Sequence, residues 1–64
     1  MKQAKQLRMM CEKVSNLTSL MDKNEQNYVS RIAYANVIRE YAKEMELTTN
    51  EIISEARKTL AANQ

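Results

Sequence analysis

Apolar residues in the first third of the chain recur with the three-four spacing of an amphipathic helix. Between Lys2 and Met21 they occupy one stripe, in which Thr18 fills the one missing place. The stripe consists of Ala4, Leu7, Cys11, Val14 and Met21, widened by Met10 and Leu17. The spacing predicts a helix from residue 2 to about residue 21. Because Cys11 lies within the stripe, we expect it to be a small buried hydrophobe rather than a reactive thiol.

A polar segment at residues 22–27 interrupts this pattern. Asp22 and Glu25 have the spacing of a capping box, which predicts a turn and the start of a second helix. The three-four spacing nevertheless resumes in phase at Tyr28, and the segment contains no glycine or proline. One continuous helix from residue 2 to about residue 46 is therefore an open alternative.

The second predicted helix, from about residue 25 to residue 46, is apolar on two nearly opposite sides. One side carries the apolar residues of its first half, which are Tyr28, Val29, Ile32 and Ala35. The other side carries Tyr34, Val37, Ile38, Tyr41, Ala42 and Met45. Two short neighbouring helices barely cover both groups, so the surplus predicts a dimer or partner interface. We expect this interface to contain Tyr34, Val37, Ile38, Tyr41 and Met45.

A second capping box precedes the last predicted helix. Thr48 and Glu51 have the S/T-x-x-E spacing directly before two isoleucines, which predicts a third helix that runs to about residue 62. The run from residue 41 to residue 57 resembles the helix-turn-helix pattern, with Ala42, Leu47 and Ile52 at the packing positions. Glu46 stands where that pattern usually has glycine.

The helix-turn-helix resemblance implies a surface that reads the major groove of DNA. Its residues would be Thr48, Thr49, Asn50, Ser54, Arg57 and Lys58. Within residues 48–58, Glu51 and Glu55 offset the charge of Arg57 and Lys58, so this segment offers no net positive charge to the phosphates. A DNA-binding transcriptional regulator is thus the alternative function.

Composition narrows the fold class. The chain has 64 residues, of which none is glycine, proline, tryptophan or phenylalanine, and strong helix formers are abundant. We expect one all-α domain spanning residues 1–64, a hairpin or bundle of two or three helices. A core of this size supplies only ~3–5 kcal/mol, and the single cysteine cannot form a disulfide within the chain. These limits favour a homodimer.

Composition also excludes several function classes. The chain has no histidine, the commonest general acid or base, and no glycine for a phosphate-binding loop. We therefore expect no enzyme, no catalytic residues, no cofactor, no metal site and no small-molecule substrate. No apolar run suits a membrane span or a secretion signal, which favours a cytoplasmic protein. The leading hypothesis is a small regulatory or adaptor protein that binds a protein partner through helix surfaces.

Overall fold

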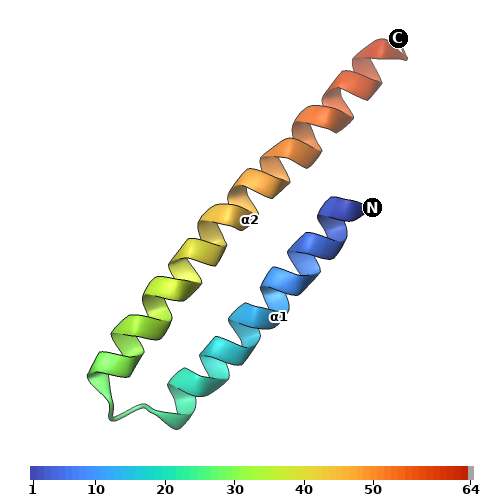
Figure 1. The fold of residues 1–64 in the computed structure, drawn as a ribbon. Coiled ribbons are helices and arrows are strands. Elements are labelled where there is room, and N and C mark those ends of the chain that lie inside the picture. Colours follow the sequence, from blue (N-terminus) through green and yellow to red (C-terminus); the bar gives the residue numbers. More distant parts are fainter. Residues whose placement is uncertain (64) are drawn as a thin grey trace.

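The computed structural model describes residues 1–63, which form two antiparallel helices joined by a short turn (Figure 1). Helix α1 spans Lys2–Lys23 and helix α2 spans Tyr28–Ala62. The prediction of an all-α hairpin is confirmed. Because α2 has 35 residues and α1 has 22, α2 continues past the N-terminus of the chain.

The polar segment contains the expected turn. Helix α1 ends at Asn24, whose backbone leaves the helical region with φ −116° and ψ 35°. The Asn24 amide Nδ2 donates a hydrogen bond of 2.8 Å to the carbonyl of Leu20, which also accepts a hydrogen bond of 3.1 Å from the Asn24 backbone N–H. The alternative of one helix from residue 2 to residue 46 is therefore wrong.

The N-cap residue of helix α2 is Asn27, and not a residue of the predicted capping box. The Asn27 side chain accepts a hydrogen bond of 3.1 Å from the backbone N–H of Ser30. Asp22 still lies within α1, too early in the chain to reach the free N–H groups of α2. Arg31 also holds the turn, since its Nη1 donates to the carbonyl of Glu25 over 3.4 Å. Its guanidinium lies 5.5 Å from the ring centroid of Tyr28.

The predicted third helix is wrong, because α2 runs without a break through residues 46–48. The capping box at Thr48 is overridden by its neighbours, which include good helix formers and no glycine or proline. Thr48 is half-buried on the side of α2 that faces α1. The Thr49 hydroxyl donates to the carbonyl of Glu46 over 2.9 Å, as threonines within helices do. The helix-turn-helix geometry is therefore absent.

One row of half-buried side chains on each helix forms the contact between them, which we call the seam. On α1 it consists of Gln3, Ala4, Leu7, Met10, Val14, Leu17 and Met21. On α2 it consists of Ser30, Tyr34, Ile38, Tyr41, Met45, Thr48 and Ile52. Among residues 1–63 no side chain is fully buried. The hairpin thus has a single contact layer and no enclosed core.

The rotation of each helix about its own axis decides which apolar residues the seam covers. Helix α1 covers the apolar group in the middle of α2, whereas Tyr28, Val29 and Ile32 remain 67%, 79% and 64% exposed. Compared with the predicted stripe, the seam on α1 is displaced toward the side of Met10 and Leu17. Cys11 therefore lies just outside the seam and is exposed. The expectation that Cys11 is buried is therefore wrong.

The hairpin is a thin rod. Its principal extents are 57 × 16 × 11 Å. Its radius of gyration is 16.2 Å, against about 11 Å for a compact domain of the same length. No residue from 1 to 63 has a positive φ, so every one adopts a conformation that any L-residue allows. The rod therefore exposes long helix faces and requires no special backbone conformation.

Candidate protein interaction surface

Two flanks run along the hairpin, one on each side of the seam. The first consists of residues that directly precede a seam residue, at every seventh position of each helix. They are Gln6, Lys13 and Leu20 on α1, and Val37, Glu44 and Glu51 on α2. Members from both helices line one groove, so the two rows share a side. We call this side the charged flank.

The opposite side is formed by residues that follow the seam, again at every seventh position. They are Ala4, Cys11 and Thr18 on α1, and Ala35, Ala42, Thr49 and Ala56 on α2. Because none of these seven residues carries a charge, we call this side the uncharged flank. Apart from Ala4, all of them are exposed in the single hairpin.

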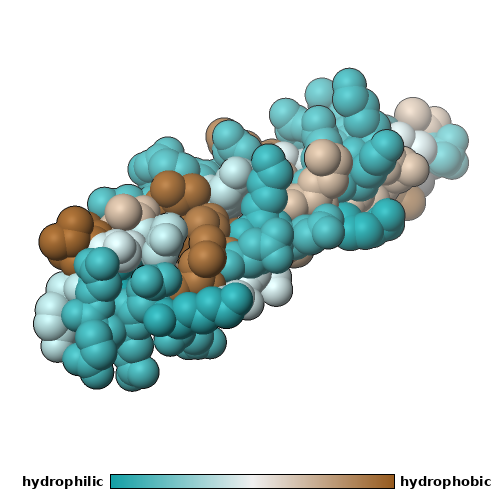
Figure 2. All heavy atoms as spheres, turned by 60° about the horizontal axis from the view of Figure 1, so that its bottom comes forward, coloured by the Kyte–Doolittle hydropathy of each residue, from teal (hydrophilic) through white to brown (hydrophobic). Residues whose placement is uncertain are grey.

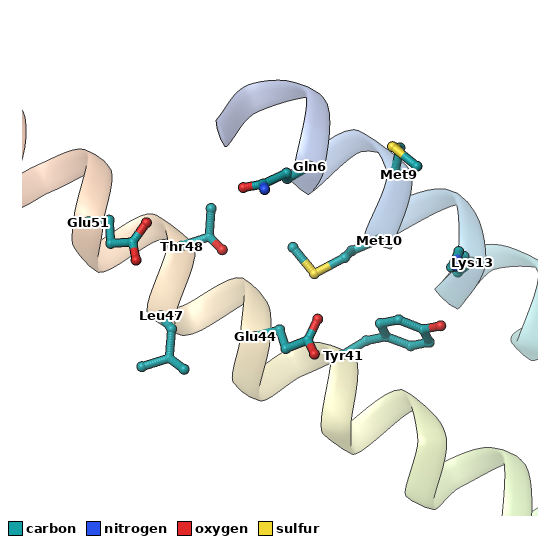
Figure 3. A pocket seen from close by; sticks show the side chains of 9 residues that line it. All are labelled: Gln6, Met9, Met10, Lys13, Tyr41, Glu44, Leu47, Thr48 and Glu51. Atoms are coloured by element: carbon teal, nitrogen blue, oxygen red, sulfur yellow. The ribbon is translucent and has the colours of Figure 1, made fainter. Parts of the chain in front are cut away.

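A groove lies on the charged flank, between the two helices. It is an open depression of about 500 Å³, to which both helices contribute side chains (Figure 3). It is lined by Gln6, Met9, Met10 and Lys13 from α1, and by Tyr41, Glu44, Leu47, Thr48 and Glu51 from α2. The lining thus combines apolar side chains with charges of both signs.

Side chains of the seam form the floor of this groove. Met10 extends from α1 toward α2, and the ring of Tyr41 lies between the two helices (Figure 3). The Lys13 ammonium lies 5.9 Å from the centroid of the Tyr41 ring, close enough for a weak cation–π attraction. This arrangement places α1 and α2 in register, with Lys13 level with Tyr41.

Four large apolar side chains remain exposed along the charged flank. Met9 and Leu47 at the groove are 50% and 65% exposed. Nearer the turn, Leu20 and Val37 are 39% and 43% exposed. Exposed apolar groups that follow one face of a rod are typical of a surface that binds another protein.

More apolar surface lies at the turn end of the molecule. Figure 2 shows hydrophobic side chains gathered toward that end, among hydrophilic ones. Leu20 at the end of α1 and the exposed group at the start of α2, which includes Val29 and Ile32, belong to this region. The apolar character of the surface therefore increases toward the turn.

The structure places the five residues expected at an interface in two settings. Tyr41 lines the groove, and Val37 is exposed on the same flank. Tyr34, Ile38 and Met45 are half-buried in the seam. The predicted interface did not include Met9 and Leu47, because both lie outside the apolar stripes. Their only signal was a large apolar side chain at a position where the periodicity predicts a polar one.

The structure brings together four of the six residues of the DNA-binding alternative. Thr48 faces the seam, whereas the other five are exposed. An open depression of about 510 Å³ brings together Asn50, Ser54, Arg57 and Lys58, with Ile53 and Ala61. Glu55 accepts a hydrogen bond of 3.2 Å from Gln3, which ties the start of α1 to α2. Arg57 and Lys58 therefore lie on the C-terminal part of α2, near and beyond the N-terminal end of α1.

Residues 1–63 contain neither a candidate metal site nor a candidate membrane span. In this range no three side chains among histidine, cysteine, aspartate and glutamate are grouped so that they could hold a metal ion. Neither helix, over the same residues, combines the length and apolar character that crossing a membrane requires.

Compared with known protein families, with curated proteins and with solved structures, the chain matches none of them.

Proposed function

We propose that this chain is a small, non-enzymatic regulatory or adaptor protein that binds a protein partner through the charged flank. The observation that supports this proposal is the groove between α1 and α2, which has an apolar floor and is continued by exposed apolar side chains. Apolar anchors within a polar rim are the usual composition of a protein interface. The single exposed thiol, Cys11, suits the reducing cytoplasm, where we place this function.

The groove favours an amphipathic helix as the partner's binding element. Two parallel rows of side chains with a hollow between them accept the apolar face of a third helix, whose anchors recur every three or four residues. On α2 the groove carries Glu44 and Glu51, and on α1 it carries Lys13. A matching helix would place basic residues along its α2 side and an acidic residue opposite Lys13.

Photocrosslinking in the native host tests this assignment. Leu47 is replaced by the photoreactive residue p-benzoylphenylalanine, which fits this exposed apolar position. The matched control carries the same residue in place of Lys43, which is exposed on α2 outside the groove lining. We expect an adduct with one other protein from position 47 and none from position 43. Introducing Val37→Glu into the first variant should remove the adduct, because it replaces one of the exposed apolar side chains of the charged flank with a charge.

Two results would contradict the proposal. One is an adduct from position 47 that contains only a second copy of this chain. The other is the same set of adducts from both positions, since this indicates nonspecific proximity rather than binding at the groove.

The DNA-binding alternative rests on the depression that Arg57 and Lys58 share with Asn50 and Ser54. It predicts a mobility shift with duplex DNA that weakens with increasing salt and on the double substitution Arg57→Ala and Lys58→Ala. We expect no such shift, because Glu51 and Glu55 lie on the same segment and the turn of the motif is missing.

A further inference from the structure

The hairpin exposes more surface than a folded chain of its mass usually does. Its accessible surface is 5366 Å², whereas a compact monomer of 7.4 kDa exposes about 4,200 Å². The excess is about 1,200 Å² for each copy. A standard protein interface buries about 800 Å² on each partner, so the excess is enough for one stable interface.

The pattern of the helices indicates which face this interface uses. In both helices the seam residues and the uncharged flank together form a stripe without charges, mostly apolar and about three-sevenths of the helix wide. A stripe of this width is typical of helices in a bundle, whereas a two-stranded coiled coil uses the seam alone and charged flanks. The charged flank departs from the bundle pattern, so the uncharged flank is the face left to be covered.

A second copy fits the uncharged flank of α2 in antiparallel orientation. About a point between Ala42 and Lys43, the row Ile32, Arg39, Glu46 and Ile53 is symmetric in position and complementary in charge. When two α2 helices cross at this point, Arg39 lies opposite Glu46 of the second copy, and Ile32 lies opposite its Ile53. In the described part of the chain, neither Arg39 nor Glu46 has an ion-pair partner of its own.

The uncharged flanks of α1 and α2 are centred close to the same point. Ala4 and Thr18 are seven residues on either side of Cys11, as Ala35 and Thr49 are on either side of Ala42. Since Lys13 lies beside Tyr41, Cys11 and Ala42 are at nearly the same height along the rod. One two-fold axis therefore passes close to both residues, and it relates α1 to α1 and α2 to α2.

We propose that two copies of this chain pair through their uncharged flanks about this axis and form an antiparallel four-helix bundle. The pairing covers the open side of each seam and leaves the charged flanks on the outside. It is independent of the proposed partner, because the groove lies on the other side of each hairpin.

Cross-linking of the unmodified thiol is the first test. The Cys11 side chains of the two copies meet near the axis, so a short bismaleimide should convert the wild-type protein to a covalent dimer. The control combines Cys11→Ser with Lys13→Cys, which moves the thiol to the charged flank and should give little dimer. Efficient cross-linking of the control but not of the wild type would overturn the proposed face.

A charge reversal is the second test, and sedimentation equilibrium measures it. Arg39→Glu and Glu46→Arg should each raise the dimer dissociation constant about tenfold. By symmetry, each substitution turns two pairs of opposite charge across the interface into two pairs of like charge. The double variant should restore the wild-type constant. These side chains are exposed in the hairpin, and circular dichroism shows whether each variant remains helical.

Three results would overturn the proposal. The first is a wild-type chain that sediments as a monomer at about 100 µM, well above the dissociation constants of ordinary homodimers. The second is a double variant that dimerises more weakly than either single variant. The third is a dimer that Leu47→Glu disrupts but Ala42→Glu does not. A monomer that still forms the photocrosslinked adduct at position 47 would refute the pairing and leave the proposed function intact.

Discussion

At the scale of single residues, two asparagines define the turn. Asn24 closes α1 with its side-chain amide, and Asn27 opens α2 with its side-chain oxygen. The Asn27 side chain takes the place of a backbone acceptor that the first turn of a helix lacks, whereas the Asn24 side chain adds a second donor to the Leu20 carbonyl. Helix α1 thus ends without the glycine that often follows a helix.

Asn27→Ala should lower the free energy of unfolding by about 1 kcal/mol, because the first turn of α2 loses the hydrogen bond to the N–H of Ser30. Urea denaturation followed by circular dichroism measures this change. The control is Asn36→Ala, which makes the same substitution at an exposed position inside α2. It should be neutral or slightly stabilising, since alanine is the better helix former. Equal losses in the two variants would show that Asn27 is not a cap.

At the scale of elements, α2 is a single helix of 35 residues. Helical backbone bonds and the seam hold its middle, where the sequence suggested a turn. Glu46 and Leu47 both favour helix, and the seam continues through Met45 and Thr48. Helix–helix packing therefore extends across the region that the local capping signal had divided.

Glu46→Pro tests this continuity. Proline within a helix removes a backbone hydrogen bond and clashes with the preceding turn, so it should cost about 3 kcal/mol or more. The comparison is Gln26→Pro, which lies in the turn between α1 and α2. We expect the thermal midpoint to fall much further for the first variant. A similar, small fall in both would mean that residues 46–48 form a turn in solution.

Much of the architecture was predictable from periodicity. The first helix, the turn at residues 22–27 and the all-α class followed from spacing and composition. The prediction of a third helix was wrong because a capping box is a local signal, and its four residues cannot reveal that packing continues on both sides. The prediction that Cys11 is buried was wrong for a related reason. Periodicity defines a broad stripe, and only packing against the other helix decides which edge of the stripe is covered.

The candidate surface was less predictable than the fold. Val37 and Tyr41 were anticipated, because α2 has more apolar residues than one neighbour can cover. Met9 and Leu47 were not, since their role depends on how α1 and α2 are rolled against each other. The roll is set by side-chain packing across the seam, which neither helix encodes alone.

At the scale of the whole molecule, shape and stability are linked. A rod of 57 × 16 × 11 Å has too little interior to enclose a side chain, and no residue from 1 to 63 is fully buried. Its stability therefore depends on whatever covers the open side of the seam.

Small-angle X-ray scattering should distinguish modes of self-association. If two hairpins lie side by side, the mass doubles while the maximum dimension stays close to the 57 Å of one hairpin. End-to-end association through the apolar turn region would nearly double that dimension instead. We expect the first result, and a clear increase in length with concentration would contradict it.

Thermal unfolding should depend on protein concentration for the same reason. When folding is coupled to association, raising the concentration shifts the equilibrium toward the folded dimer and raises the midpoint temperature. Midpoints measured over a hundredfold range of concentration should rise by several degrees. A constant midpoint would indicate that the hairpin is stable as a single copy.

The negative φ of every residue from 1 to 63 has a practical consequence. Replacing a residue with alanine is safest where the backbone already has a conformation that alanine accepts. A complete alanine scan of this chain would therefore measure the loss of side-chain interactions without added backbone strain. Few natural domains allow so direct a reading, since most contain turns that only glycine tolerates. Positions that respond would map the covered faces of the rod one residue at a time.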